Sequence, residues 1–244
     1  MSLFTKFVKC VSGGDRPVCS AVIPAAGSSS RMGGTNKLLF ELEDVPVLIR
    51  TLQVFDESES IDEIVVVTRQ EEIDSTQTLC NRFGLKKISC IVAGGATRTE
   101  SVLNGVKATS KKADLIAIHD AARPFLSLNV LEECISAAKT YHAAAPAVPV
   151  KDTVKEAEGN IVLKTLTRDR LAAIQTPQIF DRELILAALS DAQSHSAEIT
   201  DDCSAVERIG MSVYLTKGDY YNIKITTPED LVFAKAILAL EGEK

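Results

Sequence analysis

The chain repeats one pattern, a short apolar run followed by an amphipathic stretch, and this pattern restricts the folds that it can adopt. Four apolar runs occupy residues 18–23, 63–69, 88–95 and 114–120. They do not alternate between apolar and polar residues, so each is expected to be a strand buried on both faces. Helical periodicity marks residues 45–56, 71–83, 98–108 and 126–142. Strands that alternate with helices predict an α/β, Rossmann-like fold, in which a mostly parallel sheet is covered by helices on both faces.

The pattern changes after residue 142. Residues 143–150, AAAPAVPV, predict a strand whose prolines suit the edge of a sheet or a bulge. Residues 151–170 then alternate between apolar and polar around Glu158-Gly159-Asn160, which predicts a two-stranded hairpin with one exposed face. Because an isolated hairpin is marginally stable in water, we expect this arm to pack on a partner, with a second subunit as the natural candidate.

The remaining elements lie on the C-terminal side of this arm. The sequence predicts a helix over 181–193 and strands over 212–217 and 221–225. A last helix is expected to begin at Pro228, with Thr227 as its N-cap and Asp230 in its first turn, in a variant of the capping box.

The length of the chain favours a single domain. With 244 residues, of which 45% are hydrophobic, it can build one large α/β core. We therefore expect one domain over residues 18–244, in which 151–170 is an inserted arm. Residues 1–17 end in GGDRP and are expected to form a poorly ordered leader.

Composition excludes several classes of partner. The net charge of -6 argues against a general nucleic-acid surface, which needs clustered Lys and Arg. No apolar run reaches the roughly 18 residues that span a bilayer, and the start lacks a signal-peptide core, so no membrane partner and a cytoplasmic location are expected. Six cysteines without metal-ligand spacing are expected to be reduced and mostly buried: Cys10, Cys19, Cys80, Cys90, Cys134 and Cys203. The three histidines do not cluster, so zinc is not predicted.

The first strand ends in an unusual loop, PAAGSSSRMGG, at residues 24–34. Ligands of parallel sheets bind beyond the carboxyl ends of the strands, where small residues let backbone N–H groups approach an anion. The loop fits neither GxxxxGK[ST] nor GxGxxG, because no Gly-Lys-Ser/Thr follows and the glycine spacing differs. With Arg31 and Lys37 reaching over it, the loop predicts a triphosphate site. The alternative is a tight turn with two solvated cations.

Three other segments combine exposed backbone with charge. Gly94 and Gly95 follow the third strand, and Lys224 lies in a short segment with polar flanks. Asp120 ends the fourth strand, where it is either the N-cap of the next segment or a Mg²⁺ ligand that faces the triphosphate. Parallel strands end at one edge of the sheet, so a single anion site accounts for all of these features.

Seven segments carry a family resemblance. In chain order they are PAAGSSSRM with the following Asn-Lys, AGGATRTESV, IHDAARPF, VPVKDTVK, TLTRDRL with IQTPQ, ITDDCS, and YNIKITTPEDL. Together they resemble the 2-C-methyl-D-erythritol 4-phosphate cytidylyltransferases. The resemblance implies a Mg²⁺-dependent nucleotidyltransferase that moves the cytidylyl group of CTP to this sugar-alcohol phosphate and releases pyrophosphate. The reaction is a step of the non-mevalonate pathway of isoprene biosynthesis.

The resemblance also implies roles for individual residues. Arg31, Lys37 and Lys224 would neutralise the α-phosphate and its transition state, while Mg²⁺, with Asp120 as a ligand, would help to bind pyrophosphate. No acid, base or covalent nucleophile is required, because the attacking phosphate oxygen is already ionised. The nucleotide would contact Ala25, Ala26, Gly27, Gly95, Ala96, Ser101, Asp120 and Ala121. The acceptor would contact Asp120, Arg123, Thr153, Arg168, Thr176 and Thr200.

Thr153 and Arg168 lie on the predicted arm. In the family this arm crosses into the other subunit of a homodimer, which would supply the partner that an isolated hairpin lacks. Thr167 stands where many members have Asp, so Arg170 competes with Arg168 as the arm arginine. GGTN stands before Lys37, where many relatives have Pro-Lys-Gln, although the cation is retained.

Two other functions stay open at this point. The ribitol-5-phosphate cytidylyltransferases are close relatives, although ITDDCS and the Thr-rich TLTR arm look more like the first family. A catalytically silent nucleotide-binding or interaction protein is the alternative from another class. Retention of Arg31, Lys37, Asp120 and Lys224 argues against it.

Overall fold

A computed structural model describes residues 16–27 and 36–242 of the chain. Its central sheet has the strand order β10-β7-β11-β6-β1-β4-β5, and β12 also pairs with β7. The strands are β1 (Cys19–Pro24), β4 (Glu63–Thr68), β5 (Ile88–Ala93), β6 (Leu115–Ile118), β7 (Ala143–Pro149), β10 (Ala172–Ile174), β11 (Gln178–Asp181) and β12 (Tyr214–Lys217). Strands β6, β1, β4 and β5 run parallel to one another, whereas β11 is antiparallel to both β6 and β7. The predicted mostly parallel sheet is confirmed.

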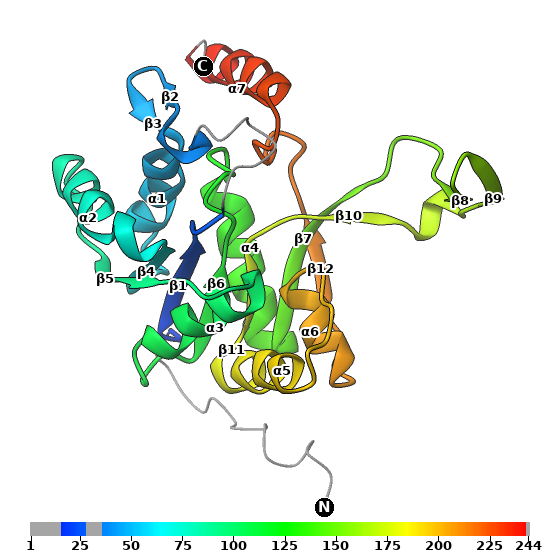
Figure 1. The fold of residues 1–244 in the computed structure, drawn as a ribbon, viewed down its shortest axis with the longest axis horizontal. Coiled ribbons are helices and arrows are strands. Elements are labelled where there is room, and N and C mark those ends of the chain that lie inside the picture. The colour runs from blue at the N-terminus through cyan, green and yellow to red at the C-terminus, as the bar shows by residue number, and fades with distance from the viewer. Residues whose placement is uncertain (1–15, 28–35, 243–244) are drawn as a thin grey trace, which may run out of the picture.

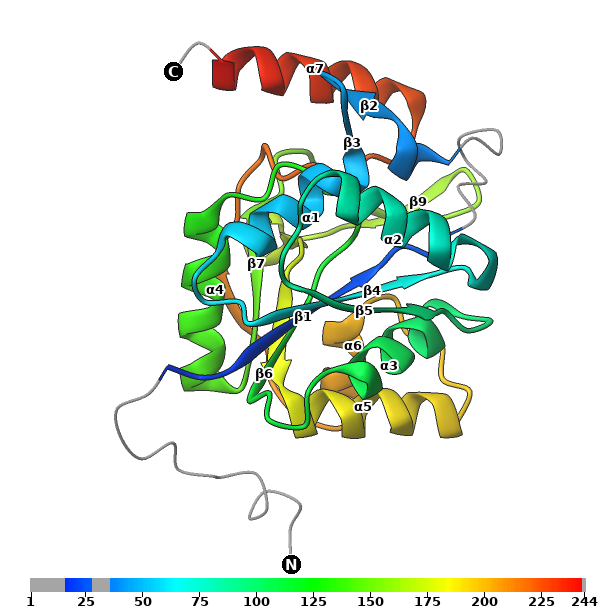
Figure 2. The ribbon, with the colours of Figure 1, turned by 90° about the vertical axis from the view of Figure 1, so that its left-hand side faces the viewer.

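Helices cover both faces of this sheet (Figure 2). One face packs against α1 (Val47–Glu57), α2 (Ile73–Arg82) and α4 (Leu128–Tyr141). Helix α7 (Pro228–Gly242) adds Ala234, Ile237 and Leu238 to the same apolar core but lies at the top of the molecule in Figure 1. The other face packs against α3 (Arg98–Ala108), α5 (Arg182–Ser194) and α6 (Asp202–Arg208).

The apolar runs of the strands are continuous because they serve two cores. In β1, Ala21 and Ile23 pack on the first face and Val22 on the second, since successive side chains of a strand point to opposite faces. All three are fully buried. This arrangement is what the absence of alternation in the sequence predicted.

Strand β7 is an interior strand, so of the two predicted alternatives, an edge or a bulge, the edge was wrong. Ala144 pairs with Ile179 of β11 and with Tyr214 of β12, which places one neighbour on each side. The sheet tolerates Pro146, which has no N–H, because Pro146 falls between the register of β11 and that of β10. Its carbonyl still accepts a hydrogen bond from the backbone N–H of Gln175 at 2.8 Å.

The segment 221–225 is not a strand, which corrects a second prediction. It begins in a turn, where the Ile223 N–H donates to the Tyr221 carbonyl, and it joins no sheet. Hydrogen bonds tie it instead to the segment that follows β6. The Ile225 N–H donates to the Ala122 carbonyl at 2.9 Å, and Arg123 donates to the Asn222 carbonyl at 2.7 Å. The last helix begins at Pro228 as predicted, and Asp230 accepts from the Thr227 N–H at 2.9 Å.

The predicted hairpin is present as β8 (Lys155–Glu158) and β9 (Ile161–Thr165). It projects from the body of the molecule (Figure 1). Every residue of both strands is exposed, and Ile161 retains 71% of its accessible surface. A second, much smaller hairpin, β2 (Glu41–Leu42) with β3 (Val45–Pro46), precedes α1.

Several smaller predictions concern the chain as a whole. Among the described cysteines all five are free and four are buried, as expected, whereas Cys10 lies outside the described residues. The described part of the chain contains no cluster of His, Cys, Asp or Glu with metal-binding geometry. It also contains no helix long and apolar enough to cross a membrane. Of the predicted leader 1–17 only Arg16 and Pro17 are described, and Arg16 pairs with Asp62 at 2.8 Å.

Candidate active site

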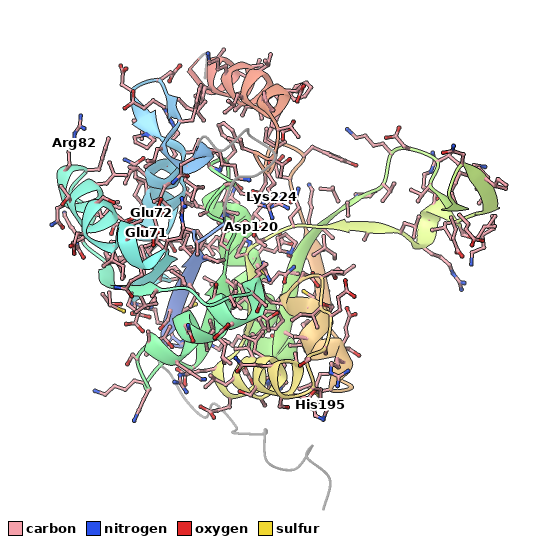
Figure 3. All side chains as sticks on the ribbon, in the orientation of Figure 1. Glu71, Glu72, Arg82, Asp120, His195 and Lys224 are labelled. Atoms are coloured by element: carbon pink, nitrogen blue, oxygen red, sulfur yellow. The ribbon has the colours of Figure 1, made fainter. Side chains whose placement is uncertain are left out.

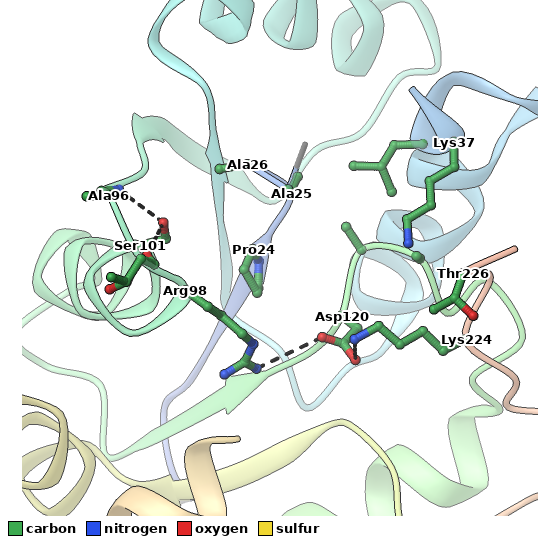
Figure 4. A pocket seen from close by; sticks show the side chains of 16 residues that line it. Pro24, Ala25, Ala26, Lys37, Ala96, Arg98, Ser101, Asp120, Lys224 and Thr226 are labelled. Carbon is green, nitrogen blue, oxygen red and sulfur yellow. Dashed lines mark hydrogen bonds and ion pairs between the residues drawn. The ribbon is translucent and has the colours of Figure 1, made fainter. Parts of the chain in front are cut away.

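A cavity of about 470 Å³ opens beyond the carboxyl ends of β1, β5 and β6 (Figure 4). It brings together every described residue that the sequence predicted for the nucleotide and its phosphates. They are Ala25, Ala26, Gly27, Lys37, Gly95, Ala96, Ser101, Asp120, Ala121 and Lys224. Arg31 lies outside the described residues. The four segments that the sequence analysis joined into one site therefore do meet in space.

A smaller cavity of about 160 Å³ adjoins the first. Three residues predicted for the acceptor line it together with Asp120, namely Arg123, Thr176 and Thr200. The two cavities share Arg98, Asp120 and Lys224, so these three side chains form the junction between them. Figure 3 shows Asp120 and Lys224 near the centre of the molecule, whereas other labelled residues such as Arg82 and His195 lie at its periphery.

Asp120 is surrounded by cations. Lys224 Nζ lies 2.9 Å and Arg123 Nε 3.4 Å from its Oδ2, and Arg98 Nη2 lies 4.0 Å from its Oδ1. Burial by itself would raise the pKa of Asp120, but the charge of Lys224, followed by those of Arg98 and Arg123, holds this pKa at about 2. The carboxylate is therefore ionised at neutral pH. Both of its oxygens face side-chain cations, so it serves as an anionic centre at the junction and not as the N-cap that the sequence left open.

One wall of the larger cavity is formed by the end of β5 and the start of α3, and it packs closely against Ala26 at the end of β1. Thr97 caps α3 by accepting from the Glu100 N–H, and Ser101 Oγ accepts from the Gly95 N–H at 3.0 Å. A side chain at Gly94 would place its Cβ 2.8 Å from both Ala26 Cβ and Ser101 Oγ. Only glycine lets these two walls of the cavity lie so close together.

A buried histidine, His119, supports the residues that line the smaller cavity. His119 is fully buried, and this burial lowers its pKa to about 4. Its Nε2 lies 3.1 Å from the Arg123 carbonyl, which can only accept, so Nε2 carries the proton. Nδ1 then accepts from the Thr176 hydroxyl at 3.0 Å, and that hydroxyl accepts from the Asp120 N–H at 3.1 Å. Neutral His119 thus fixes the positions of Thr176 and of the segment that carries Asp120 and Arg123.

Lys37 begins a short 3-10 turn, Lys37–Leu39, that Asn36 caps. The Asn36 Oδ1 accepts from the Leu38 N–H at 3.1 Å, and its Nδ2 donates to Glu72 at 3.3 Å. Glu72 in turn accepts from Thr68 at the end of β4. The lysine is therefore anchored to the sheet, and in Figure 4 its side chain points into the cavity. Asn at position 36 supplies this anchor in the stretch GGTN, which departs from the family pattern.

Two predicted acceptor residues are not part of either cavity. Thr153 and Arg168 lie on the arm, and no described residue of 151–170 lines the two cavities. The Arg168 guanidinium donates to the Lys151 carbonyl at 3.2 Å, within the arm itself. Arg170, its competitor, lies in the same 3-10 turn, Arg168–Arg170. Within one chain, the structure therefore leaves this part of the predicted acceptor site incomplete.

The sequence analysis missed Arg98 and its partner Asp202. The guanidinium makes two hydrogen bonds to this carboxylate, at 3.0 and 2.7 Å, and the Asp202 side chain is fully buried. Both residues stand in segments that carried the resemblance, AGGATRTESV and ITDDCS, but no role was predicted for either of them. An Arg at the start of a helix, where the positive end of the helix dipole disfavours it, was the available signal.

The fold and the site by themselves define a class: an α/β protein whose strand ends form a cation-lined cavity with a second, smaller cavity beside it. The family model for 2-C-methyl-D-erythritol 4-phosphate cytidylyltransferase matches residues 19–240. The chain belongs to this family.

Curated relatives and solved structures agree with this assignment. The 2-C-methyl-D-erythritol 4-phosphate cytidylyltransferase of Halalkalibacterium halodurans is 47% identical over 221 residues, which cover 90% of this chain and 96% of the relative. That of Caldanaerobacter subterraneus is 48% identical over 222 residues, with 90% and 98% covered. The crystal structure of 4-diphosphocytidyl-2C-methyl-D-erythritol synthase from Anaerococcus prevotii superposes with a TM-score of 0.82 at 35% identity and covers 92% of this chain and 100% of that one. The predictions of the family and of a cytidylyltransferase are confirmed.

Proposed function

We propose that the two cavities separate the two substrates of this cytidylyltransferase, with CTP in the larger and the acceptor in the smaller. The reaction transfers a cytidylyl group from CTP to 2-C-methyl-D-erythritol 4-phosphate and gives 4-diphosphocytidyl-2-C-methyl-D-erythritol and pyrophosphate. The observation that carries the proposal is the shared junction of Arg98, Asp120 and Lys224. A phosphate of the acceptor must reach the α-phosphorus of CTP, and only at this junction do the two cavities meet.

The chemistry at the junction is mainly electrostatic. The attacking phosphate oxygen is ionised, so it needs no general base, and repulsion between two anions is the main barrier. Lys37 and Lys224 line the larger cavity and offset this repulsion at the α-phosphate, together with Arg31 by family resemblance. Asp120 holds Lys224 by an ion pair at 2.9 Å, which keeps the ammonium directed at the junction.

Base recognition is assigned to backbone and small side chains. Ala25, Ala26, Gly95 and Ala96 line the larger cavity, and Gly94 sets how close its walls come. A pocket of this kind reads the edge of cytosine with peptide groups and excludes the larger purine ring system by contact. CTP should therefore be strongly preferred over ATP and GTP, and comparable turnover with ATP would contradict this assignment.

Asp120 is the residue proposed to hold Mg²⁺. The donor set fits, because Mg²⁺ is commonly bound by one or two carboxylates together with substrate phosphates, and this carboxylate is ionised and lines the larger cavity. The ion would neutralise charge on the pyrophosphate that leaves.

The arm is proposed to complete the acceptor site of a second subunit. Thr153 and Arg168 reach neither cavity of their own chain, and β8 and β9 bury no residue. Ile161, Val162 and Leu163 are all more than half exposed. A homodimer in which each arm crosses to the other subunit would cover this apolar surface and bring Arg168 to a site. A cytoplasmic location is part of the same proposal.

An acceptor panel tests the function directly. Purified protein with CTP and Mg²⁺ should form the CDP-alcohol and pyrophosphate in equal amounts with 2-C-methyl-D-erythritol 4-phosphate, and much less with ribitol 5-phosphate. Preference for ribitol 5-phosphate would move the chain to the alternative activity. Failure to form product with either acceptor, although CTP binds, would support the catalytically silent alternative.

A further inference from the structure

Arg98 lies at the junction of the two cavities, and the proposed chemistry assigns no role to it. It is one of only two cations among the described residues that line both cavities and stand within 4.0 Å of Asp120, the other being Lys224. In Figure 4, Arg98 and Lys224 approach Asp120 from opposite sides. Arg123, in contrast, lines only the smaller cavity, and Lys37 lines only the larger.

The guanidinium is held in one orientation. Both oxygens of Asp202 accept hydrogen bonds from Arg98, and this carboxylate is fully buried. Asp202 is itself fixed, because its backbone N–H donates to the Gln178 side chain at 3.0 Å. Of the five N–H groups of a guanidinium, the two bonds to Asp202 leave three for another anion. The side chain keeps 36% of its accessible surface, so part of it faces the open space at the junction.

The local backbone also favours an anion here. Arg98 is the first residue of α3, and Ala96 and Thr97, which precede this helix, line the larger cavity. The positive end of the helix dipole therefore points toward the same region. A cation placed at a helix start is unfavourable by itself, and Asp202 offsets this cost.

We infer that Arg98 binds the phosphate group of the acceptor as it lies at the junction, and that Asp202 is the positioning residue that aims the guanidinium. The inference rests on the proposed function and assigns the attacking phosphate to a particular side chain. Lys224 then neutralises the α-phosphate from one side of Asp120, while Arg98 orients the attacking phosphate from the other. Arg is suited to this task because its planar fork fixes the direction of a phosphate, which a lysine ammonium does not.

Steady-state kinetics with each substrate varied separately test this inference. Arg98→Lys keeps the charge beside Asp202 but loses the fork, and it should raise the KM for the acceptor about 10-fold or more while the KM for CTP changes less than about twofold. Asp202→Asn leaves the Arg98 charge in place and should raise the KM for the acceptor by a smaller factor. Binding of CTP alone, measured by calorimetry, should be unchanged in both variants.

A double variant removes both charges of the ion pair, so that no buried charge is left unpaired and the protein can still fold. Removing only the Arg98 charge would leave Asp202 buried without a partner, so Arg98→Gln is combined with Asp202→Asn to remove both charges. This double variant should show the largest rise in the KM for the acceptor, again with unchanged binding of CTP. Arg208→Lys is the matched control. Arg208 ends α6, the helix that begins at Asp202, and it pairs with Asp191 at 2.9 Å on the surface. This control should leave both KM values unchanged.

The possible outcomes distinguish failure of the role inferred for Arg98 from failure of the proposed function. Equal changes in both KM values, or a lower melting temperature with unchanged KM values, would make Arg98 a structural residue and overturn the inference alone. Wild-type protein that forms no CDP-alcohol with this acceptor would overturn the proposed function and the inference with it.

Discussion

The pocket at the strand ends and the projecting arm differ in where their stabilising contacts come from. Asp120, at the centre of the pocket, is bonded to Lys224, Arg123 and Thr176 of its own chain. The arm has an internal ladder and a surface ion pair, but every residue of β8 and β9 is exposed. The difference supports the proposal that a single chain preorganises the site for CTP and that a second subunit completes the acceptor site.

The largest expected effect concerns the cations of the pocket. Lys37→Ala and Lys224→Ala should each lower kcat roughly 10²-fold or more, because each charge is proposed to act mainly on the transition state. Steady-state kinetics at saturating substrates measure this change, with thermal melting as the check on folding. Lys107→Ala, at the other end of α3, is the matched control and should leave kcat unchanged. Near wild-type turnover in either pocket variant would return that lysine to the class of surface charges.

The next prediction asks whether the arm serves another chain. Lys224→Ala damages the pocket and Arg168→Ala the arm, and each variant should be nearly inactive alone. When the two are unfolded and refolded together in equal amounts, half of the dimers are mixed, and each mixed dimer holds one intact and one doubly damaged site if the arms cross. About a quarter of wild-type activity should then return. Activity that stays at the average of the two variants would place both residues in one chain's site, and refolded wild type provides the control.

A third prediction uses the buried histidine of the pocket. The folded pKa of His119 is about 4, below its ordinary value of 6.5, so the unfolded chain binds a proton that the folded chain rejects between these two pH values. The free energy of unfolding should therefore fall by up to about 3 kcal/mol as the pH drops from 6.5 to 4. Denaturant unfolding across this range measures the slope. His119→Gln should flatten the curve in this window, and an unchanged slope would show that another group causes it.

The smallest effect is expected on the arm. Lys164 and Glu156 form an ion pair across the hairpin at 2.7 Å, with both side chains largely exposed. Such pairs contribute less than about 1 kcal/mol, so Lys164→Ala should hardly change the free energy of unfolding. Chemical denaturation measures this difference against wild type. A loss several times larger would mean that the arm, like the pocket, is stabilised by contacts within its own chain.

Much of the fold could be predicted because local patterns report burial directly. The continuous apolar runs at 18–23 and 63–69 required strands buried on both faces, and the alternation around Gly159 required a hairpin with an exposed side. The two points that the structure corrects, the edge alternative for the strand at 143–150 and the strand at 221–225, have one cause. Whether a segment has neighbours on both sides, on one side or on none depends on which distant segments reach it, and no local pattern records this.

Most of the candidate site could also be placed from the sequence. Residues at the ends of parallel strands meet at one edge of the sheet, so Gly95 and Asp120 were expected in one pocket, and both line it. Arg98 was missed because its importance lies in a contact with Asp202, 104 positions away. Spacing within a motif does not reveal a pairing of this kind.

The sequence by itself determined the α/β architecture, the glycine-containing strand ends and the hairpin, because each follows from residues within a few positions of one another. The tertiary structure decided which charges meet. The hydrogen bond from the Ile225 N–H to the Ala122 carbonyl holds the segment of Lys224 beside Asp120, and the buried Asp202 holds Arg98 at the junction. Electrostatic interactions depend on distances of a few ångströms in space, and those distances are fixed when the whole chain has packed.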